Sequence, residues 1–347
     1  MHVLVTGGAG FIGSHVVDRL VADGHRVRVV DRVHPQAHDV HPEPRHESVE
    51  YRWADVGRPL VADAAVEGVD AVCHQAAMVG LGVDFDDVTG YVADNDGATA
   101  TLLRALHRRG FAGRIVLASS MVVYGEGRYR CAEHGPVPAG PRSPADLDAG
   151  RYEPPCPTCR ASLEPEPVPE SAAPDPRNVY AATKLHQEHL CAAYAREHPG
   201  ASVAALRYHN VYGSRMPRDT PYAGVASIFR SALEAGQAPR VFEDGGQRRD
   251  FIDVRDVARA NVAALTADPS VSGPFNIATG RPRTVLEMAQ ALARAMAGPE
   301  PEVVGGHRLG DVRHVFAAAD RAREELGFSA EIDFEPGMAE FSIAPLR

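Results

Sequence analysis

The first thirty residues constrain the fold more than any other stretch. A short apolar run, His2 to Thr6, leads into the glycine-rich turn Gly7-Gly8-Ala9-Gly10-Phe11-Ile12-Gly13. Apolar residues at helical spacing follow as far as Ala22, and a second apolar run ends at Asp31. A strand, a glycine turn, a helix and a second strand that ends in a carboxylate form the fingerprint of a dinucleotide-binding unit.

Each part of this fingerprint has a physical role. Gly7 permits a tight turn, Gly10 lets backbone N–H groups approach a pyrophosphate, and Gly13 lets the helix pack closely on the strand. The carboxylate of Asp31 can accept hydrogen bonds from both ribose hydroxyls and would repel a 2′-phosphate, which favours NAD over NADP. Arg32 beside it weakens that preference slightly.

Strands continue to alternate with helices after this unit. We expect strands near 49–53, 71–74, 115–118 and 203–206, and helices near 59–67, 91–108 and 179–197. This alternation predicts an α/β fold with a doubly wound parallel sheet of the Rossmann type, whose ligands bind beyond the carboxyl ends of the strands. Asp55 and Val56 would then flank the adenine, and Ala76 and Ala77 would border the nicotinamide side.

The last third of the chain has a mixed pattern. Helices are expected near 223–235, 254–266 and 284–297, with the segments 239–242 and 251–254 between them. We therefore expect a dinucleotide-binding domain over 1–205, with an insertion at about 126–175, and a smaller mixed α/β substrate domain over 206–347 that is interleaved with the first.

Tyr180 and Lys184 are the candidate proton-transfer pair. They are four residues apart on a predicted helix and so share one face. A tyrosine titrates near pH 10 and is a poor base unless a cation favours its phenolate, which Lys184 can supply. Such a pair is common on surface helices, but the glycine fingerprint and the hydroxyl of Ser120, at the end of the fifth strand, favour a catalytic role.

Composition excludes several kinds of partner. The chain has 347 residues and a formal net charge of -10, without a basic tract. Nucleic acid and anionic membrane surfaces are therefore unexpected partners. Since no apolar run approaches the length of a membrane span and Met1 leads directly into a strand, we expect neither a span nor a signal peptide, and a cytoplasmic protein. The five cysteines do not have the pattern of a disulfide framework.

With these residues assembled, the chain resembles the extended short-chain dehydrogenase/reductases, and within them the NAD-dependent nucleotide-sugar epimerase/dehydratase family. The resemblance covers essentially residues 1–343. The motifs that carry it are Thr6 to Gly13, Ser119-Ser120 leading to Tyr124-Gly125, Tyr180 with Lys184, Arg207 to Gly213, Arg249 to Ile252, and Gly310 to Arg313.

The resemblance implies an NAD-binding domain and a domain that clamps a nucleoside diphosphate sugar, with UDP and dTDP both possible. It implies Ser120, Tyr180 and Lys184 as catalytic residues. The implied cofactor contacts are Gly7, Gly10, Phe11, Ile12, Gly13, Asp31, Arg32, Asp55, Val56, Ala76, Ala77, Ser119, Tyr180, Lys184 and Tyr208. The implied substrate contacts are Ser120, Met121, Asn210, Val225, Val241, Arg249, Arg308 and Asp311.

The residues after Ser120 separate the subclasses of this family. Members that eliminate water carry an Asp-Glu pair there, whereas this chain has Met121 and Val122, which cannot transfer protons. The resemblance therefore implies a 4-epimerase: Tyr180 takes the C4 hydroxyl proton, hydride passes to NAD, the 4-keto sugar turns over, and hydride returns. Residues 220–225 and 242–251 look most like dTDP-L-rhamnose 4-epimerases. One departure is Asp94, where many relatives have Asn.

Two alternatives to an epimerase are compatible with most of these motifs. A reductase or dehydrogenase of the same family would share these motifs and would release its cofactor in each turnover, and a 4,6-dehydratase is a further alternative within the family. A protein of another class, an NAD-occupied scaffold or regulator, would not need the tyrosine and lysine that this chain retains.

The predicted insertion contains a possible metal site. Its pairs Cys131-x-x-His134 and Cys156-x-x-Cys159 match the ligand spacing of a closed tetrahedral zinc site. The insertion is otherwise rich in Pro and charge, which argues against a core element. The alternative is free surface thiols and a chance histidine. Four protein ligands leave no open position, so a structural rather than a catalytic zinc is expected.

A homodimer is also expected from the sequence. The predicted helix over 91–108 has a wide face of apolar and small residues, namely Ala98, Leu102, Leu103 and Leu106. This helix and that over 179–197 could pack against the same pair of a second subunit. The alternative is that both helices only cover the sheet.

Overall fold

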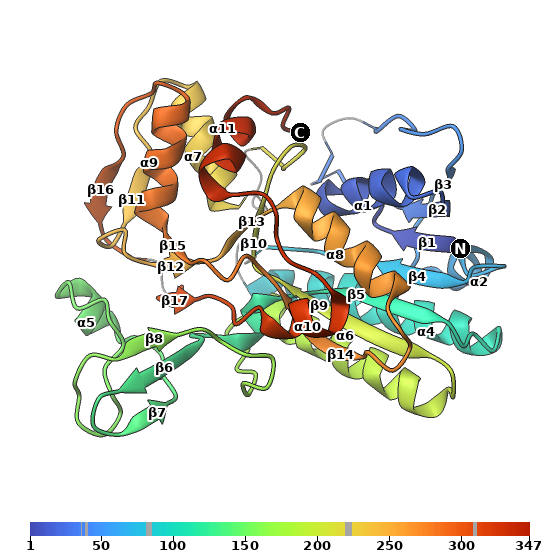
Figure 1. The fold of residues 1–347 in the computed structure, drawn as a ribbon, viewed down its shortest axis with the longest axis horizontal. Coiled ribbons are helices and arrows are strands. Elements are labelled where there is room, and N and C mark those ends of the chain that lie inside the picture. The colour runs from blue at the N-terminus through green and yellow to red at the C-terminus, as the bar shows by residue number, and fades with distance from the viewer. Residues whose placement is uncertain (36, 39–40, 81–84, 219–223, 308–310) are drawn as a thin grey trace.

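A seven-stranded parallel sheet forms the centre of the molecule (Figure 1). The computed structural model describes all residues except 36, 39–40, 81–84, 219–223 and 308–310. The strand order is β14-β9-β5-β4-β1-β2-β3, and every neighbouring pair is parallel. The strands are β1 (His2–Thr6), β2 (Arg26–Asp31), β3 (Glu50–Trp53), β4 (Ala71–His74), β5 (Arg114–Ser120), β9 (Ser202–Tyr208) and β14 (Gly273–Ile277).

Helices cover both faces of this sheet, as the predicted doubly wound fold requires. One face packs against α1 (Phe11–Ala22), α8 (Val254–Thr266) and α10 (Asp320–Leu326), and the other against α2 (Pro59–Ala65), α4 (Ala98–Arg108) and α6 (Val179–Glu197). Successive strand residues point to opposite faces. Val3 and Val5 of β1 therefore join the first core, and Leu4 joins the second.

The predicted helix over 91–108 is one part of a longer helical run. It comprises α3 (Val88–Tyr91), the π-helical η2 (Val92–Gly97) and α4, and follows the 3-10 turn η1 (Phe85–Asp87). Inside the π-helical segment, the buried side chain of Asn95 accepts a hydrogen bond from the Met78 backbone N–H at 2.7 Å and donates one to Thr183 of α6 at 2.9 Å. The irregular segment thus holds the loop after β4 against α6.

The chain beyond β9 builds a second core but also contributes to the first. Its helices α7 (Val225–Glu234), α9 (Val285–Ala295) and α11 (Phe334–Ile343) pack around their own apolar cluster, at the upper left of Figure 1. The short strands are β10 (Asn210–Tyr212) with β13 (Phe251–Asp253), β11 (Arg240–Phe242) with β16 (Glu302–Gly305), and β12 (Arg248–Arg249) between β15 (Arg283–Thr284) and β17 (His314–Val315).

The division of the chain at 205/206 falls inside β9. Strand β14 and helix α8 lie beyond that boundary in the sequence, and both pack into the large sheet and its first core. The sequence reading did not predict β14, whose segment Gly273-Pro274-Phe275-Asn276-Ile277 lacks an alternating pattern. The two units are therefore interleaved in space, and their separation into domains stays a prediction.

The insertion is more ordered than its composition indicated. Strands β6 (Arg128–Cys131), β7 (Gly135–Val137) and β8 (Glu164–Glu166) form a small antiparallel sheet, accompanied by the short helix α5 (Pro144–Asp148). Tyr129, Cys131, Cys156 and Leu163 are buried in an apolar cluster of its own, together with Ala139. The expectation that this segment has no core element is therefore wrong.

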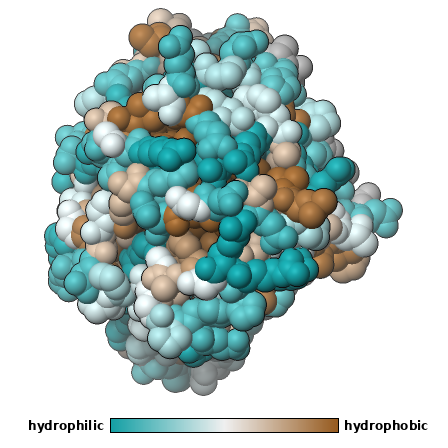
Figure 2. Space-filling view, turned by 90° about the vertical axis from the view of Figure 1, so that its right-hand side faces the viewer, coloured by the Kyte–Doolittle hydropathy of each residue, from teal (hydrophilic) through white to brown (hydrophobic). Residues whose placement is uncertain are grey.

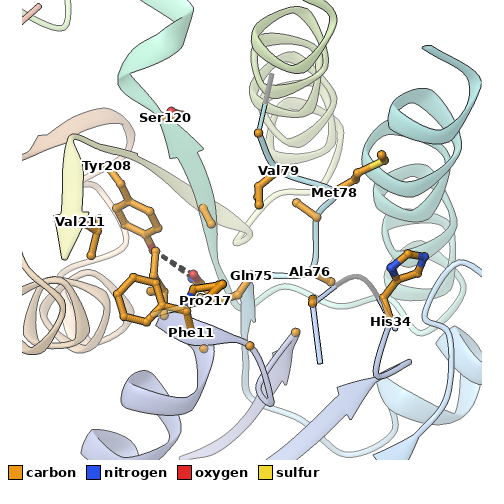
Figure 3. A pocket seen from close by; sticks show the side chains of 18 of the residues that line it. Phe11, His34, Gln75, Ala76, Met78, Val79, Ser120, Tyr208, Val211 and Pro217 are labelled. Carbon is orange, nitrogen blue, oxygen red and sulfur yellow. Dashed lines mark hydrogen bonds between the residues drawn. The ribbon is translucent and has the colours of Figure 1, made fainter. Parts of the chain in front are cut away.

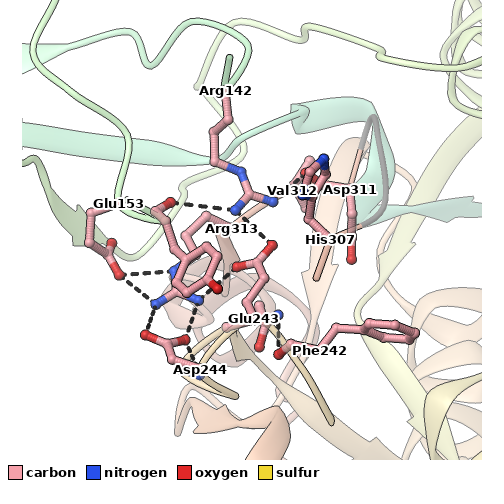
Figure 4. Close-up of polar contacts among 12 residues, drawn as sticks. Arg142, Glu153, Phe242, Glu243, Asp244, His307, Asp311, Val312 and Arg313 are labelled. Atoms are coloured by element: carbon pink, nitrogen blue, oxygen red, sulfur yellow. Dashed lines mark hydrogen bonds and ion pairs between the residues drawn. The ribbon is translucent and has the colours of Figure 1, made fainter. Parts of the chain in front are cut away.

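Buried ion pairs fasten the insertion to the second core (Figure 4). Arg142 of the insertion donates to the Glu243 carboxylate at 2.8 Å and to the Asp311 backbone carbonyl at 2.8 Å. Arg313 also pairs with Glu243, at 2.9 Å, and with Glu153 of the insertion, at 2.7 Å. The side chains of Arg142 and Glu243 are 4% and 1% exposed, so this contact is shielded from solvent.

The apolar face that suggested a homodimer is used within one chain. Ala98, Leu102, Leu103 and Leu106 are all buried in the second core, beneath α4. These four residues therefore support the alternative that the helix covers the sheet, and the homodimer stays a prediction. Figure 2 shows the side of the molecule that lies at the right of Figure 1, on which hydrophilic residues separate several small apolar patches. None of the helices formed by the described residues is long and apolar enough to cross a membrane.

Candidate active site

A cavity of about 500 Å³ opens at the carboxyl ends of β1, β4 and β5. This volume is in the range of small-molecule and cofactor sites. All fifteen residues expected to contact the cofactor line it, from the glycine turn to Tyr208. Figure 3 shows that Phe11, Ala76 and Tyr208 reach it from different elements.

The glycine turn is shaped so that only glycine fits at two of its positions. Gly7 has a φ of +69°, and a Cβ there would lie 2.6 Å from the Ala76 backbone nitrogen. A Cβ on Gly13 would lie 2.1 Å from the Gly7 carbonyl oxygen, so Gly13 lets α1 start directly against the turn. No described side chain caps the first turn of α1. The N–H groups at its start are thus available to an anion such as a pyrophosphate.

Asp31 lies at the end of β2 and is fixed in place. Its carboxylate accepts hydrogen bonds from the backbone N–H groups of Ala9 at 3.0 Å and Val33 at 2.8 Å. Arg32 instead turns to Asp94, and the two side chains form a two-pronged pair with one contact of 2.7 Å. The charge of Arg32 is thereby neutralised, so it offsets Asp31 less than the sequence indicated.

The tyrosine and the lysine lie at the same rim as Ser120. Asn178 caps α6 through its side chain, which accepts a hydrogen bond from the Ala181 N–H at 2.8 Å, so that Tyr180 occupies the first turn. The hydroxyls of Tyr180 and Ser120 are hydrogen-bonded. The ammonium of Lys184 lies 5.9 Å from the centre of the Tyr180 ring.

The expected lowering of the Tyr180 pKa is not present in the structure. Burial raises the pKa of the Tyr180 phenol to about 12, and the hydrogen bond from Ser120 opposes this rise only in part. Burial also lowers the pKa of Lys184 to about 8, against the opposing effect of Asp96 and Glu188. The cost of desolvation is larger here than the attraction between cation and phenolate at this separation.

Only some of the expected substrate contacts lie at the cavity. Ser120, Met121, Asn210 and Val225 line it. Val241 does not, because it is fully buried in the second core. Arg308 lies outside the described residues.

Arg249 and Asp311 lie together, but away from the described cavity lining. The Arg249 guanidinium donates to the backbone carbonyls of Val312 at 2.6 Å and Arg313 at 2.9 Å, and approaches the Asp311 carboxylate at 3.4 Å. Its donors thus hold the segment that leads into β17. That Arg249 and Asp311 contact substrate stays a prediction.

The cavity also contains residues that the sequence reading missed. Gln75 donates to the Tyr208 hydroxyl at 3.0 Å and to Asn261 at 2.9 Å, as Figure 3 shows for the tyrosine. Its place directly after β4 could have identified it, since ligands bind at strand ends. His34, Met78, Val79, Val211, Pro217 and Arg347 also line the cavity. No local pattern distinguishes these residues.

Fold and site together define an NAD-dependent enzyme of the short-chain dehydrogenase/reductase type. The model of the NAD dependent epimerase/dehydratase family matches residues 3–145 and 159–278, and the chain belongs to this family.

Two curated relatives and two solved structures are similar to this chain over nearly its whole length. A dTDP-L-rhamnose 4-epimerase of Burkholderia thailandensis is 35% identical, over 97% of this chain and 93% of its own. A UDP-glucose 4-epimerase of Mycolicibacterium smegmatis is 31% identical, over 98% and 96% of the two chains. Among solved structures, UDP-glucose 4-epimerase of Thermotoga maritima with UDP-glucose has a TM-score of 0.80 at 27% identity, covering 99% and 97% of the chains. The Thermus thermophilus enzyme with NAD has a TM-score of 0.76 at 28% identity, covering 99% and 98%.

Proposed function

We propose that this protein is an NAD-dependent nucleotide-sugar 4-epimerase. The observation that carries the proposal is the meeting of Ser120, Tyr180 and Lys184 with the glycine turn in one cavity. The relatives described above, which are named as 4-epimerases of nucleotide sugars, support it.

The residues of this chain supply proton transfer and orientation. Tyr180 accepts the proton of the sugar C4 hydroxyl, and Ser120, hydrogen-bonded to it, shares that proton. Bound NAD supplies a reversible hydride acceptor, so the 4-keto sugar is transient and no net redox occurs. Met121 and Val122 follow Ser120 and have no proton to donate or accept. The elimination of water that a dehydratase performs therefore lacks its acid and base.

We further propose a dTDP-linked 6-deoxy sugar as the substrate, with a UDP-sugar as the alternative. The Burkholderia thailandensis relative supports the choice. The side chains of Met78, Val79 and Met121, which line the cavity together with Ser120, also give it apolar walls. A methyl group at C6 gains free energy when it is buried against such walls, whereas a hydroxymethyl group needs a hydrogen-bond partner there.

The test is an assay with dTDP- and UDP-sugars, in which NMR follows the configuration at C4. An epimerase should interconvert the two epimers without a steady absorbance change at 340 nm and should retain NAD through purification. Tyr180→Phe should lower kcat at least about a hundredfold, because it removes the proton acceptor. A steady change at 340 nm in each turnover would support the reductase or dehydrogenase alternative. Full activity of Tyr180→Phe would contradict the proposal.

We also propose a structural zinc ion in the insertion. The ligand atoms of Cys131, His134, Cys156 and Cys159 all lie within 4.8 Å of one another. Cys131 Sγ is 3.6 Å from Cys159 Sγ and 3.4 Å from His134 Nδ1. Zinc bonds of about 2.3 Å to sulfur and 2.0–2.1 Å to nitrogen place tetrahedral ligands about 3.8 Å apart for two sulfurs and about 3.6 Å for sulfur and nitrogen. The two separations at Cys131 are close to these values.

A cytoplasmic location and a homodimer complete the proposal. None of the five cysteines forms a disulfide bond, which agrees with a reducing compartment. Light scattering coupled to size-exclusion chromatography measures the oligomeric state directly. A mass of one chain at micromolar concentration would contradict the homodimer.

A further inference from the structure

Residues 345–347 are fastened to the loop that follows β10. The Arg347 backbone N–H donates to the Met216 carbonyl at 3.1 Å, and the Arg218 N–H donates to the Arg347 carbonyl at 2.7 Å. The Arg215 N–H donates to the Pro345 carbonyl at 2.6 Å. Leu346 packs against the second core. Backbone pairing and apolar packing thus fix the position from which the Arg347 side chain extends.

That side chain crosses to the glycine turn. Its guanidinium donates to the Ala9 backbone carbonyl and, at 3.3 Å, to the Ser14 hydroxyl. Ala9 belongs to the turn itself and Ser14 to the first part of α1. Arg347 also lines the same cavity as Gly10, Gly13 and Asp31. A residue from the far end of the chain therefore lies beside the dinucleotide fingerprint.

The guanidinium has a negative charge nearby but no ion pair, since Asp31 raises the pKa of Arg347 from beyond ion-pair distance. Within the part of the chain that the structure describes, no carboxylate approaches Arg347 within ion-pair distance, and both of its acceptors are neutral oxygens. The nearby cations Arg45 and Arg215 already pair with Asp18, at 3.1 Å and 2.8 Å. Burial, together with Arg215, lowers the pKa of Arg347 to about 10, so it is still charged at neutral pH. A half-buried cation beside a helix N-terminus favours binding of an anion.

We propose that Arg347 is a cofactor-binding residue that holds the diphosphate of NAD at the start of α1. The inference rests on the proposed function, since it takes NAD as the ligand of this cavity. A guanidinium has five N–H donors, so two bonds to neutral oxygens leave others for phosphate oxygens. Segment 345–347 then closes one side of the dinucleotide site and slows the exit of NAD, which suits an enzyme that regenerates its cofactor in place.

The test measures NAD retention in the purified holoenzyme, independently of sugar chemistry. Wild type, Arg347→Gln and Arg347→Lys are compared with Arg281→Gln, which removes an arginine on an exposed surface. NAD per chain is measured after acid release, and the dissociation rate is measured by exchange with excess isotope-labelled NAD. We expect about tenfold to hundredfold faster exchange for Arg347→Gln, as charge-assisted hydrogen bonds to a diphosphate predict. Arg347→Lys should lie between, and Arg281→Gln should match wild type.

Exchange by Arg347→Gln at the wild-type rate would overturn the proposal. A melting curve in saturating NAD reports whether each variant is folded. If Arg347→Gln is unstable, Arg347→Lys is the variant that tests the proposal. Lysine retains the charge but lacks the planar guanidinium, so this variant must still exchange NAD faster than wild type. Wild-type protein that exchanges NAD but epimerises no sugar would count against the proposed function alone. Full epimerase activity with unchanged exchange in the variants would count against the role of Arg347 alone.

Discussion

The ammonium of Lys184 donates a hydrogen bond to the backbone carbonyl of Ala118, 2.9 Å away, and is almost completely buried. The carbonyl fixes the ammonium at the end of β5, one helical turn from Tyr180. Lys184 is also the only lysine in the sequence, whose other strongly basic residues are all arginines. A compact ammonium fits a buried site that the larger guanidinium would overfill.

The pKa of this lysine can be measured directly. Since the chain has a single lysine, protein labelled with ¹³C at lysine Cε should give one NMR signal. In protein freed of nucleotide, we expect that signal to titrate near pH 8, and in urea near the ordinary 10.5. Titration near 10.5 in the folded protein would show that burial does not lower the pKa.

The same shift predicts a pH dependence of stability. Between pH 8 and 10.5 the unfolded chain binds more protons at Lys184 than the folded chain, so the contribution of Lys184 to stability rises with pH. Lys184→Met has no such group. In urea unfolding at pH 7, 8.5 and 10, the free energy of unfolding of wild type should rise relative to that of Lys184→Met, by at most about 1.4 kcal/mol per pH unit. A constant difference between them would contradict this expectation.

Ser120 should tune the basicity of Tyr180. Its hydroxyl stabilises the Tyr180 phenolate by a hydrogen bond, and its loss should raise the Tyr180 pKa further. Ser120→Ala should lower kcat about tenfold, and the rising limb of the pH–rate profile should move to higher pH. Ser120→Thr keeps a hydroxyl and is the matched control. Unchanged pH profiles in both variants would indicate that the hydrogen bond does not affect the base.

Zinc should be bound in a ratio of one ion per chain. Elemental analysis of purified protein tests this, and Cys156→Ala should lose the ion because three ligands remain. Cys73→Ala, which changes a buried cysteine outside the cluster, is the control and should keep it. Since none of the four ligands lines the cavity, Cys156→Ala should melt at a lower temperature but retain NAD. Protein without stoichiometric zinc would remove the metal site.

The contact between the insertion and the second core should contribute strongly to stability. Arg142→Met leaves Glu243 buried with one partner fewer and should lower the free energy of unfolding by about 3 kcal/mol. Arg151→Met is the matched control, because Arg151 lies in the same insertion with a side chain that is 64% exposed. Its loss should change stability by less than about 0.5 kcal/mol. Equal changes in the free energy of unfolding for both substitutions would contradict a stabilising role of the buried ion pair.

Local patterns in the sequence predicted much of this protein. The glycine turn, Asp31 and the alternation of strands and helices identified the parallel sheet, and α6 and α8 occupy the predicted ranges. These features follow from hydrophobic periodicity and from the conformations that only glycine allows, both of which operate over a few residues. Strand ends then located the cavity, because parallel strands bring their carboxyl ends to one edge.

Tertiary structure determined the features that local sequence patterns do not predict. Strand β14 joins the sheet because β9 offers it an edge, and Arg249 turns to the 312–313 carbonyls rather than to the cavity. Burial raised the Tyr180 pKa where sequence alone indicated a lowering. The contact of Arg347 with Ala9 joins residues 338 positions apart. Such contacts and pKa shifts depend on which surfaces exclude water together, and that is set only when the whole chain has packed.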